Sequence, residues 1–205
     1  GGAPEFNFYT PEMVWQLSDD MSLLSAMNDD YRITVRSPTG DVVRIVTMPF
    51  ERRPVTERDQ QALLGFLDEM WVGAGVPPAL LPRLHERVSF GEFFPAFTGI
   101  QTGPAGTMWV QHVQTTADLS EEELEGFNAF EDSGAPEWDV FDSEGRYLGV
   151  VTMPQRFTPR LFHGDRIYGV WRDDLDVQYV MRLRIRGIPP ELAARPAEDE
   201  HDETA

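Results

Sequence analysis

The stretches ITVRSPTGDVVRIVTMP (residues 33–49) and WDVFDSEGRYLGVVTMP (residues 138–154) align without a gap in this chain of 205 residues. Each consists of two runs rich in β-branched and aromatic residues, which are typical of strands. A short turn joins the runs, and its Gly40 or Gly145 can adopt a positive φ. The alignment therefore predicts two copies of one β-hairpin, each ending at a proline.

Two further strand-like segments precede each hairpin. They are expected at residues 14–18 and 21–27 in the first unit, and at 98–102 and 107–113 in the second. A third unit starts at 160–162, returns through 167–171, continues through 177–185 and then stops. The sequence thus predicts antiparallel meanders of four, four and three strands.

Two insertions interrupt the meanders, and both contain helix signals. Thr56 and Asp59 form a capping-box variant at the start of a helical pattern over 56–71, and Ser120 with Glu123 forms another capping box. The expected organisation is a cloning scar at 1–6, a body at 7–187 and an acidic disordered tail at 188–205. The body comprises a first unit at 12–49, a helical insertion at 50–94, a second unit at 95–154 containing an insertion at 115–136, and a third unit at 157–187.

Repeated four-stranded meanders are typical of β-propeller blades, which bury both faces against neighbouring blades. A β-sandwich is the alternative, and its strands would alternate cleanly between polar and apolar residues. The run VVRIV at 42–46 is apolar on both sides and favours the propeller. The predicted fold class is all-β with helical insertions.

Framework motifs are spread over nearly all of residues 12–187. They are DYRI (30–33), PVT (54–56), FPAF (94–97), MWV (108–110), WDVFD (138–142) with Gly145, and GVWRD (169–173). In these motifs the chain resembles the bacterial six-bladed β-propeller proteins that are distantly related to NHL-repeat propellers. The chain resembles only the C-terminal half of such proteins, which implies three blades of six, the last one incomplete. The resemblance also implies a periplasmic or secreted location.

Three blades alone would expose two apolar blade faces and unpaired strand edges, which is an aggregation hazard. We therefore expect a homodimer in which a two-fold axis closes a six-bladed ring. The aromatic segment FNFY at 6–9 is expected to cross to the partner and supply the missing outer strand of its third blade.

Charge and composition exclude several classes of partner. The 35 acidic residues outnumber the 17 basic ones and give a formal net charge of −18, which disfavours nucleic acid and anionic lipid surfaces. No apolar run approaches the roughly 18 residues that a membrane helix needs, so a soluble protein is expected. With no cysteine, the chain can form no disulfide and has no thiol nucleophile.

Strand direction places both insertions at one end of the predicted ring, and long loops over a rigid scaffold are common ligand sites. His112, near that end, is the candidate catalytic residue, because a neutral imidazole can act as a base or bind a metal. Packing between blades with hydrogen bonds to the backbone is the more ordinary role of such a histidine.

Aspartates in the turns at the same end are candidate ligands of a divalent cation such as calcium, magnesium or zinc. They are Asp29, Asp173 and Asp176, together with Asp30 and Asp174. Turn capping is the more ordinary role of such residues. Gln16 and Arg160, on innermost strands, are candidate ligand-binding side chains that face the channel, with blade packing as the alternative.

Two functional hypotheses remain at this stage. In the first, a cation at the channel mouth polarises an ester, lactone or phosphotriester while His112 activates water, as the six-bladed propellers of the paraoxonase and regucalcin kind imply. In the second, a non-catalytic propeller binds a peptide, a glycan or a protein partner. The fold alone does not decide between them.

Overall fold

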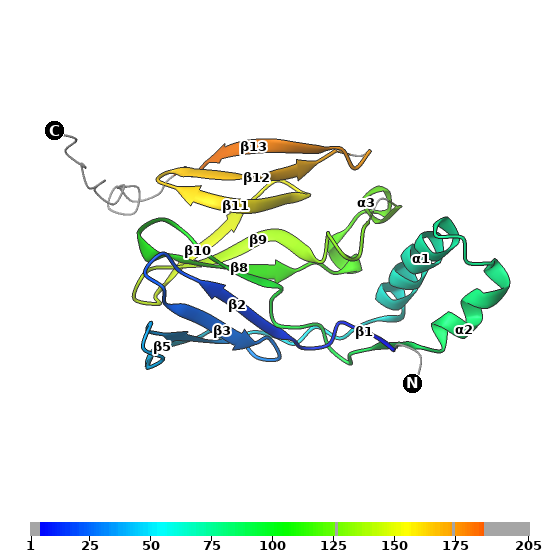
Figure 1. Ribbon diagram of the computed structural model, residues 1–205, viewed down its shortest axis with the longest axis horizontal. Helices are drawn as coiled ribbons and strands as arrows, with labels where there is room; N and C mark the ends of the chain where they lie inside the picture. The colour runs from blue at the N-terminus through cyan, green and yellow to red at the C-terminus, as the bar shows by residue number, and fades with distance from the viewer. Residues whose placement is uncertain (1–4, 126, 174, 187–205) are drawn as a thin grey trace, which may run out of the picture.

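A computed structural model describes residues 5–125, 127–173 and 175–186 of the chain. Three antiparallel sheets are stacked face to face, and Figure 1 shows them one above another. The first sheet contains β2 (Met13–Leu17), β3 (Leu23–Met27), β4 (Arg32–Arg36) and β5 (Val42–Thr47). The second contains β7 (Gly99–Thr102), β8 (Met108–Val113), β9 (Gly134–Phe141) and β10 (Tyr147–Thr152). The third contains β11 (Phe157–His163), β12 (Arg166–Arg172) and β13 (Gln178–Arg184). The predicted order of four, four and three strands is confirmed, and the fold is mostly β.

The sequence repeat is also a structural repeat. In the first sheet Ile33 pairs with Val46, and in the second Trp138 pairs with Val151 at the equivalent positions. Both hairpins have a register shift at the same place, next to the turn. Gly40 and Gly145 have φ of 91° and 82°, so both turns use the conformation that glycine adopts without strain.

Two apolar cores hold the stack together, one on each face of the second sheet. The core between the first and second sheets contains Ile33, Phe97, Val110 and Phe141, all at most 2% exposed. The core between the second and third sheets is built around Trp109, Trp138, Phe157 and Ile167. The second sheet is therefore buried on both faces, and each flanking sheet packs on it through one face.

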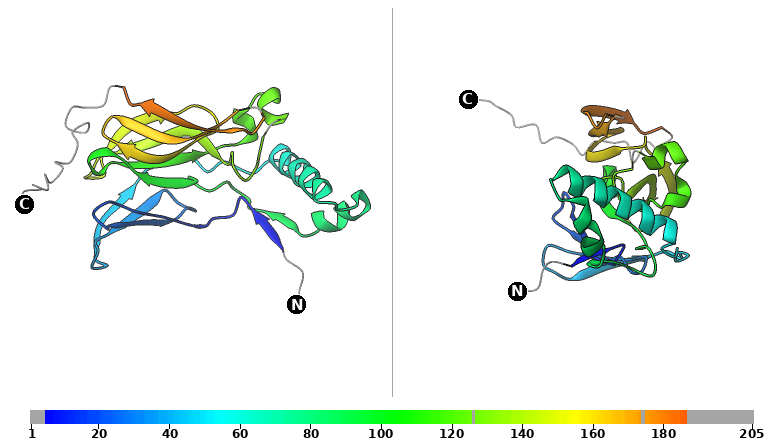
Figure 2. Two further views of the ribbon diagram at one scale, coloured as in Figure 1. Left: turned by 45° about the horizontal axis from the view of Figure 1, so that its top comes forward. Right: turned by 90° about the vertical axis from the view of Figure 1, so that its right-hand side faces the viewer.

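The helices gather at one end of the stack, whereas short hairpin turns form the other end (Figures 1 and 2). The helical end contains α1 (Glu57–Gly73), η1 (Pro78–Leu80), α2 (Leu81–His85), η3 (Thr116–Asp118) and α3 (Glu121–Glu125). The remaining 3₁₀ turn, η2 (Pro104–Gly106), connects β7 to β8. Among the described residues, no helix is long and apolar enough to cross a membrane.

A buried carboxylate anchors the helical end to the sheets. Asp59 closes the capping box of α1 by accepting a hydrogen bond from the backbone N–H of Thr56 at 2.8 Å. Its other oxygen accepts from the backbone N–H and the hydroxyl of Thr116, at 3.0 and 2.6 Å. Because Asp59 is only 3% exposed, these bonds fix α1 against the insertion that follows β8.

The prediction that residues 6–9 cross to a partner is wrong. β1 (Phe6–Phe8) instead pairs in parallel with β6 (Val88–Phe90) of its own chain. The ring of Tyr9 lies 4.7 Å from that of Phe94, so aromatic packing on the helical insertion keeps this segment on its own chain. Residues 1–4 and the tail predicted at 188–205 lie outside the described residues.

Candidate functional site

Two hollows flank the second sheet near the helical end. A groove of about 530 Å³ lies between the first and second sheets, and His112 is in its wall. A cavity of about 220 Å³ lies between the second and third sheets. Four residues at the margin of the second sheet line both hollows: Gln114, Ala135, Pro136 and Gln155. A third hollow, of about 710 Å³, lies at the hairpin end.

His112, near the end of β8, forms an ion-pair contact in the groove. Its Nε2 lies 2.9 Å from Oδ2 of Asp139, which is on the neighbouring strand β9. The imidazole is 37% exposed, whereas the carboxylate is 3% exposed. His112 is thus held by a buried side chain rather than by the backbone.

Two tyrosines complete the environment of Asp139. The Tyr31 hydroxyl donates to Oδ2 at 2.8 Å, and the Tyr147 hydroxyl donates to Oδ1 at 3.2 Å. Tyr31 immediately precedes β4 of the first sheet and is 3% exposed, whereas Tyr147 begins β10 and is 50% exposed. We call Tyr31, His112, Asp139 and Tyr147 the Asp139 network. It spans the interface between the first two sheets.

The contacts within the network raise the pKa of His112 and Tyr31 and lower the pKa of Asp139. The hydrogen bond with Asp139, assisted by the negative charge of that residue and of Glu137, raises the pKa of His112 against the opposing effects of burial and of Arg53. Burial raises the pKa of Asp139, but the hydrogen bonds from His112 and Tyr31 outweigh it, so the net shift is downward. Burial and the Asp139 charge raise the pKa of Tyr31. A charged imidazole beside a charged carboxylate is therefore favoured at mildly acidic pH.

A histidine oriented by a buried carboxylate can act as a general base or simply cross-link two sheets. The groove holds further charge, because Arg53 Nη1 lies 2.9 Å from Asp118 while its Nη2 donates to the carbonyl of Val113. The geometry is compatible with proton transfer at the exposed part of the His112 ring.

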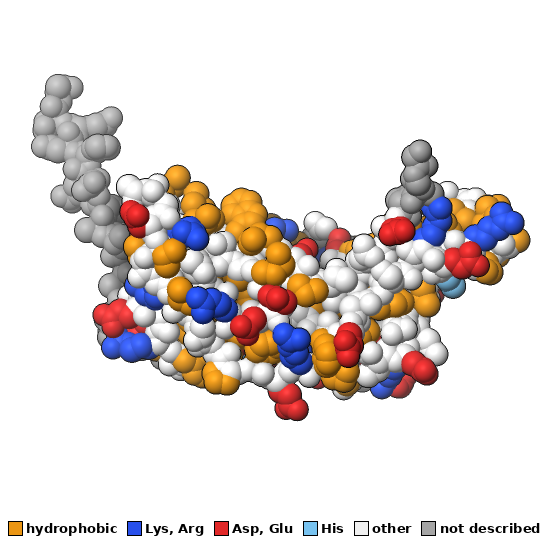
Figure 3. All heavy atoms as spheres, turned by 90° about the horizontal axis from the view of Figure 1, so that it is seen from below, with side chains coloured by type: hydrophobic (Ala, Val, Ile, Leu, Met, Phe, Trp, Pro, Cys, Tyr) orange, Lys and Arg blue, Asp and Glu red, His pale blue; other side chains and the backbone are white. Residues whose placement is uncertain are grey.

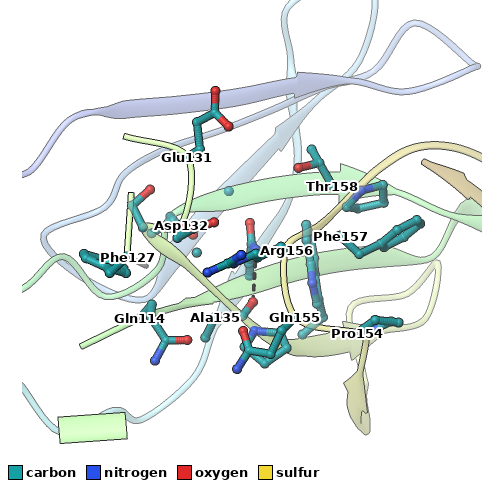
Figure 4. A pocket seen from close by; sticks show the side chains of 18 of the residues that line it. Gln114, Phe127, Glu131, Asp132, Ala135, Pro154, Gln155, Arg156, Phe157 and Thr158 are labelled. Atoms are coloured by element: carbon teal, nitrogen blue, oxygen red, sulfur yellow. Dashed lines mark hydrogen bonds between the residues drawn. The ribbon is translucent and has the colours of Figure 1, made fainter. Parts of the chain in front are cut away.

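The cavity on the other face of the second sheet has a mixed lining (Figure 4). Figure 4 shows Arg156 in the middle of it, with Gln114, Phe127 and Asp132 around. The aromatic part of the wall includes Phe127, Trp138 and Phe157, and the amide part includes Gln101, Gln111 and Gln114. Its volume of about 220 Å³ is below the roughly 300–1,000 Å³ of drug-sized pockets, so it can hold only a small molecule.

An arginine cluster forms one side of the cavity. The guanidinium of Arg172, 7% exposed, contacts Glu131 and Asp176 at 2.8 and 2.7 Å and also pairs with Asp132. Arg156 has a φ of 56°, which is uncommon for a residue with a side chain, and its Nη1 donates to the carbonyl of Asp173 at 3.2 Å. The carboxylates of this cluster are therefore already engaged by arginine.

The structure does not gather the candidate metal ligands. Asp29 lies in the turn after β3, whereas Asp173 and Asp176 follow β12. Asp173 accepts from the N–H groups of Leu175 and Val177, and Asp176 pairs with Arg172. Among the described residues no three His, Asp or Glu side chains are placed to hold one metal ion. Asp174 lies outside the described residues.

The two candidate ligand-binding residues lie apart from these hollows. Gln16 pairs with Leu24 in the first sheet, and its amide donates to the carbonyl of Leu17 at 2.9 Å. Arg160 is an exposed residue at the register shift of β11. Neither lines the groove or the cavity.

Sequence reasoning singled out His112 but missed its partners. Asp139 stands between two buried residues, Trp138 and Val140, and a charged residue within such a run signals a buried polar contact. Tyr31 offered no comparable signal, because its hydroxyl meets Asp139 only after the first two sheets have packed. No protein-family model matches the sequence, and a search of curated proteins finds no match either.

Proposed function

We propose that the chain is half of a six-bladed β-propeller, that a second copy completes the ring, and that the assembly is a binding protein with its ligand site at the helical end. The main support for this proposal is that the first and third sheets each have an apolar, exposed face on the side away from the second sheet. Trp15 and Met13 of the first sheet are 65% and 60% exposed, and Leu161 and Val180 of the third are 57% and 88% exposed. Figure 3, viewed from below the first sheet, shows hydrophobic side chains spread over that side. Exposed apolar faces of this kind mark association surfaces.

The two bare faces are complementary rather than alike. Ile33 and Trp138 occupy equivalent repeat positions, and each packs its face of the sheet on the next sheet along the chain. Both contacts in the stack therefore have the same polarity: the face that carries Ile33 or Trp138 packs on the opposite face of the following sheet. In the first sheet, the face turned away from the second sheet is exposed. In the third sheet, the face turned away from the second sheet is exposed, and Val170 pairs with Val180 on it.

A second copy can therefore repeat the contact that the chain already makes twice. The third sheet of one copy would pack on the first sheet of its partner, and a two-fold axis would make the same contact again and close six sheets. Within the described residues the third sheet has three strands, and this does not affect the stacking, because stacking uses sheet faces and not edges.

The oligomeric mass tests the proposal. Light scattering coupled to size-exclusion chromatography should give twice the mass of the chain. Trp15→Glu should give monomers, because it puts a charge into the contact. Leu80→Glu, at a 43% exposed residue of the helical insertion, is the matched control and should remain a dimer. A monomeric unmutated chain at micromolar concentration would refute ring closure.

The pairing of His112 with Asp139 favours a second candidate function, hydrolysis of an ester, lactone or phosphotriester with His112 as the base. Turnover should be measured on all three substrate types with and without a chelator, which reveals any contribution of a divalent cation. His112→Ala should abolish turnover.

His85→Ala is the control for that experiment, because His85 also pairs with an aspartate, Asp68, at 2.6 Å, but in the helical insertion. It should leave turnover unchanged. Turnover that His112→Ala does not reduce, or no turnover on any substrate, would leave only the binding function.

A further inference from the structure

The wall of the cavity between the second and third sheets includes a buried polar group that has no hydrogen-bond partner among the described residues. The indole N–H of Trp138 has no hydrogen-bond acceptor within the described part of the chain, although the residue is only 2% exposed. Leaving a buried donor unsatisfied costs about 1–3 kcal/mol, so native proteins rarely do it. Trp138 is in the cavity wall, where a bound molecule can supply the acceptor.

A second feature of the wall is backbone strain beside the same space. Arg156 lines the cavity with a φ of 56°, a conformation that costs roughly 1–3 kcal/mol for a residue other than glycine. Glycine at this position would remove the strain but would also remove the guanidinium that Figure 4 places in the middle of the cavity. Strained residues of this kind concentrate at ligand sites.

The chemistry of the wall suits hydroxyl groups. The Trp138 N–H needs an acceptor, whereas the amides of Gln101, Gln111 and Gln114 can both donate and accept. The side-chain amide of Gln111 already donates one N–H to the carbonyl of Ala135 at 3.0 Å. A hydroxyl donates and accepts at once, so a ligand with several hydroxyls can satisfy all of these groups.

The wall does not suit a cation. The carboxylates in the wall are already engaged within the chain, because Glu131 and Asp132 pair with Arg172 and Glu123 accepts from the Ser120 hydroxyl. The indole N–H of Trp138 needs an acceptor, which a cation cannot provide. Phe127 and Phe157 add apolar surface on which the C–H groups of a ring can pack.

We propose that this cavity binds a small neutral polyhydroxylated molecule, such as a monosaccharide or a cyclic polyol, with the indole N–H of Trp138 donating to one of its oxygens. The inference rests on the proposed binding function and specifies its ligand class. It does not depend on ring closure, because every group that it uses belongs to one chain.

The test follows the five indole N–H resonances of the chain by two-dimensional NMR, with the Trp138 resonance assigned from its loss in Trp138→Phe. Glucose, N-acetylglucosamine and myo-inositol are titrated to millimolar concentration, with acetate and methylammonium as ionic controls. At least one neutral probe should move the Trp138 resonance in a saturable manner. If none does, or if only an ion does, the proposal is overturned.

Variants separate ligand binding from folding. Trp138→Phe should weaken binding of the active probe about tenfold, the value of one lost hydrogen bond. Trp109→Phe is the matched control, because its indole N–H already donates to Thr107 at 3.0 Å, and it should bind unchanged. If Trp138→Phe folds poorly, Gln101→Leu should weaken binding severalfold. Unchanged binding in both cavity variants would overturn the proposal, and the mass measured on the same samples reports ring closure separately.

Discussion

Equivalent rows of residues cross the first and second sheets, but only the row of the second sheet is buried at its centre. In the first sheet the row runs through Trp15, Ser25, Thr34 and Ile45, and its two ends are 65% and 44% exposed. In the second sheet the corresponding row runs through Ile100, Val110, Asp139 and Val150. Its two middle residues are at most 2% exposed, whereas Ser25 and Thr34 in the middle of the first row are only half-buried, and the edge residue Val150 is 49% exposed.

The difference comes from position in the stack and not from the local sequence. The first sheet itself covers the row of the second sheet, and no described residue covers the row of the first. A side chain such as Trp15 gains about 25 cal/mol for each Å² of apolar surface removed from water. Covering this row would therefore stabilise the protein further.

The largest loss of stability is expected from replacing Asp139, the charged residue in the buried row of the second sheet. Asp139→Ala should lower the free energy of unfolding by about 3 kcal/mol, because it leaves the buried Tyr31 hydroxyl without its acceptor and removes the ion-pair partner of His112. Urea unfolding measures the change. Asp142→Ala, in the exposed turn that follows β9, is the control and should cost less. Equal losses would mean that the Asp139 network does not hold the sheets together.

A smaller, graded effect is expected from the two tyrosines that donate to Asp139. Tyr31→Phe should cost about 1.5 kcal/mol, because the 3% exposed hydroxyl bonds to a charged acceptor. Tyr147→Phe should cost no more than about 0.5 kcal/mol, since its 50% exposed hydroxyl can bond to water instead. The reverse order in urea unfolding would show that burial does not set the strength of these bonds.

The smallest effect concerns pH. Because the folded pKa of His112 is raised, its stabilisation is complete below about pH 6.5, the unfolded value, and is lost as pH rises through the folded pKa. Asp139 has a lowered pKa, so its contribution is lost only as pH falls below about 3.9. Urea midpoints at fixed protein concentration should fall as pH rises above about 6.5, and His112→Gln should reduce the fall. An unchanged fall in the variant would assign it to other groups.

The sequence predicted what depends on short-range pattern. The hairpin repeat, the strand order and the helix after Thr56 follow from turn glycines, β-branched runs and a capping box, and all are observed. The course of residues 6–9 could not be predicted, because parallel pairing of β1 with β6 depends on where the helical insertion folds back.

The candidate site was less accessible from sequence. His112 stood out as a lone titratable group, but its partners Asp139 and Tyr31 come from different sheets. The cavity at Trp138 was missed altogether, because an unsatisfied indole can be recognised only when all neighbouring acceptors are placed. The prediction that turn aspartates bind a metal ion was misleading, because Asp173 accepts hydrogen bonds from backbone N–H groups of its own turn.

Cross-linking between copies tests the central claim that the first sheet of one copy packs on the third sheet of another. Because the chain has no cysteine, Ser25→Cys and Val170→Cys introduce unique thiols on the second strands, β3 and β12, of the two bare faces. A short bismaleimide should join the two single variants to each other when they are mixed, and should leave each variant alone largely uncoupled. Coupling of either variant with itself, or none in the mixture, would contradict the closed ring.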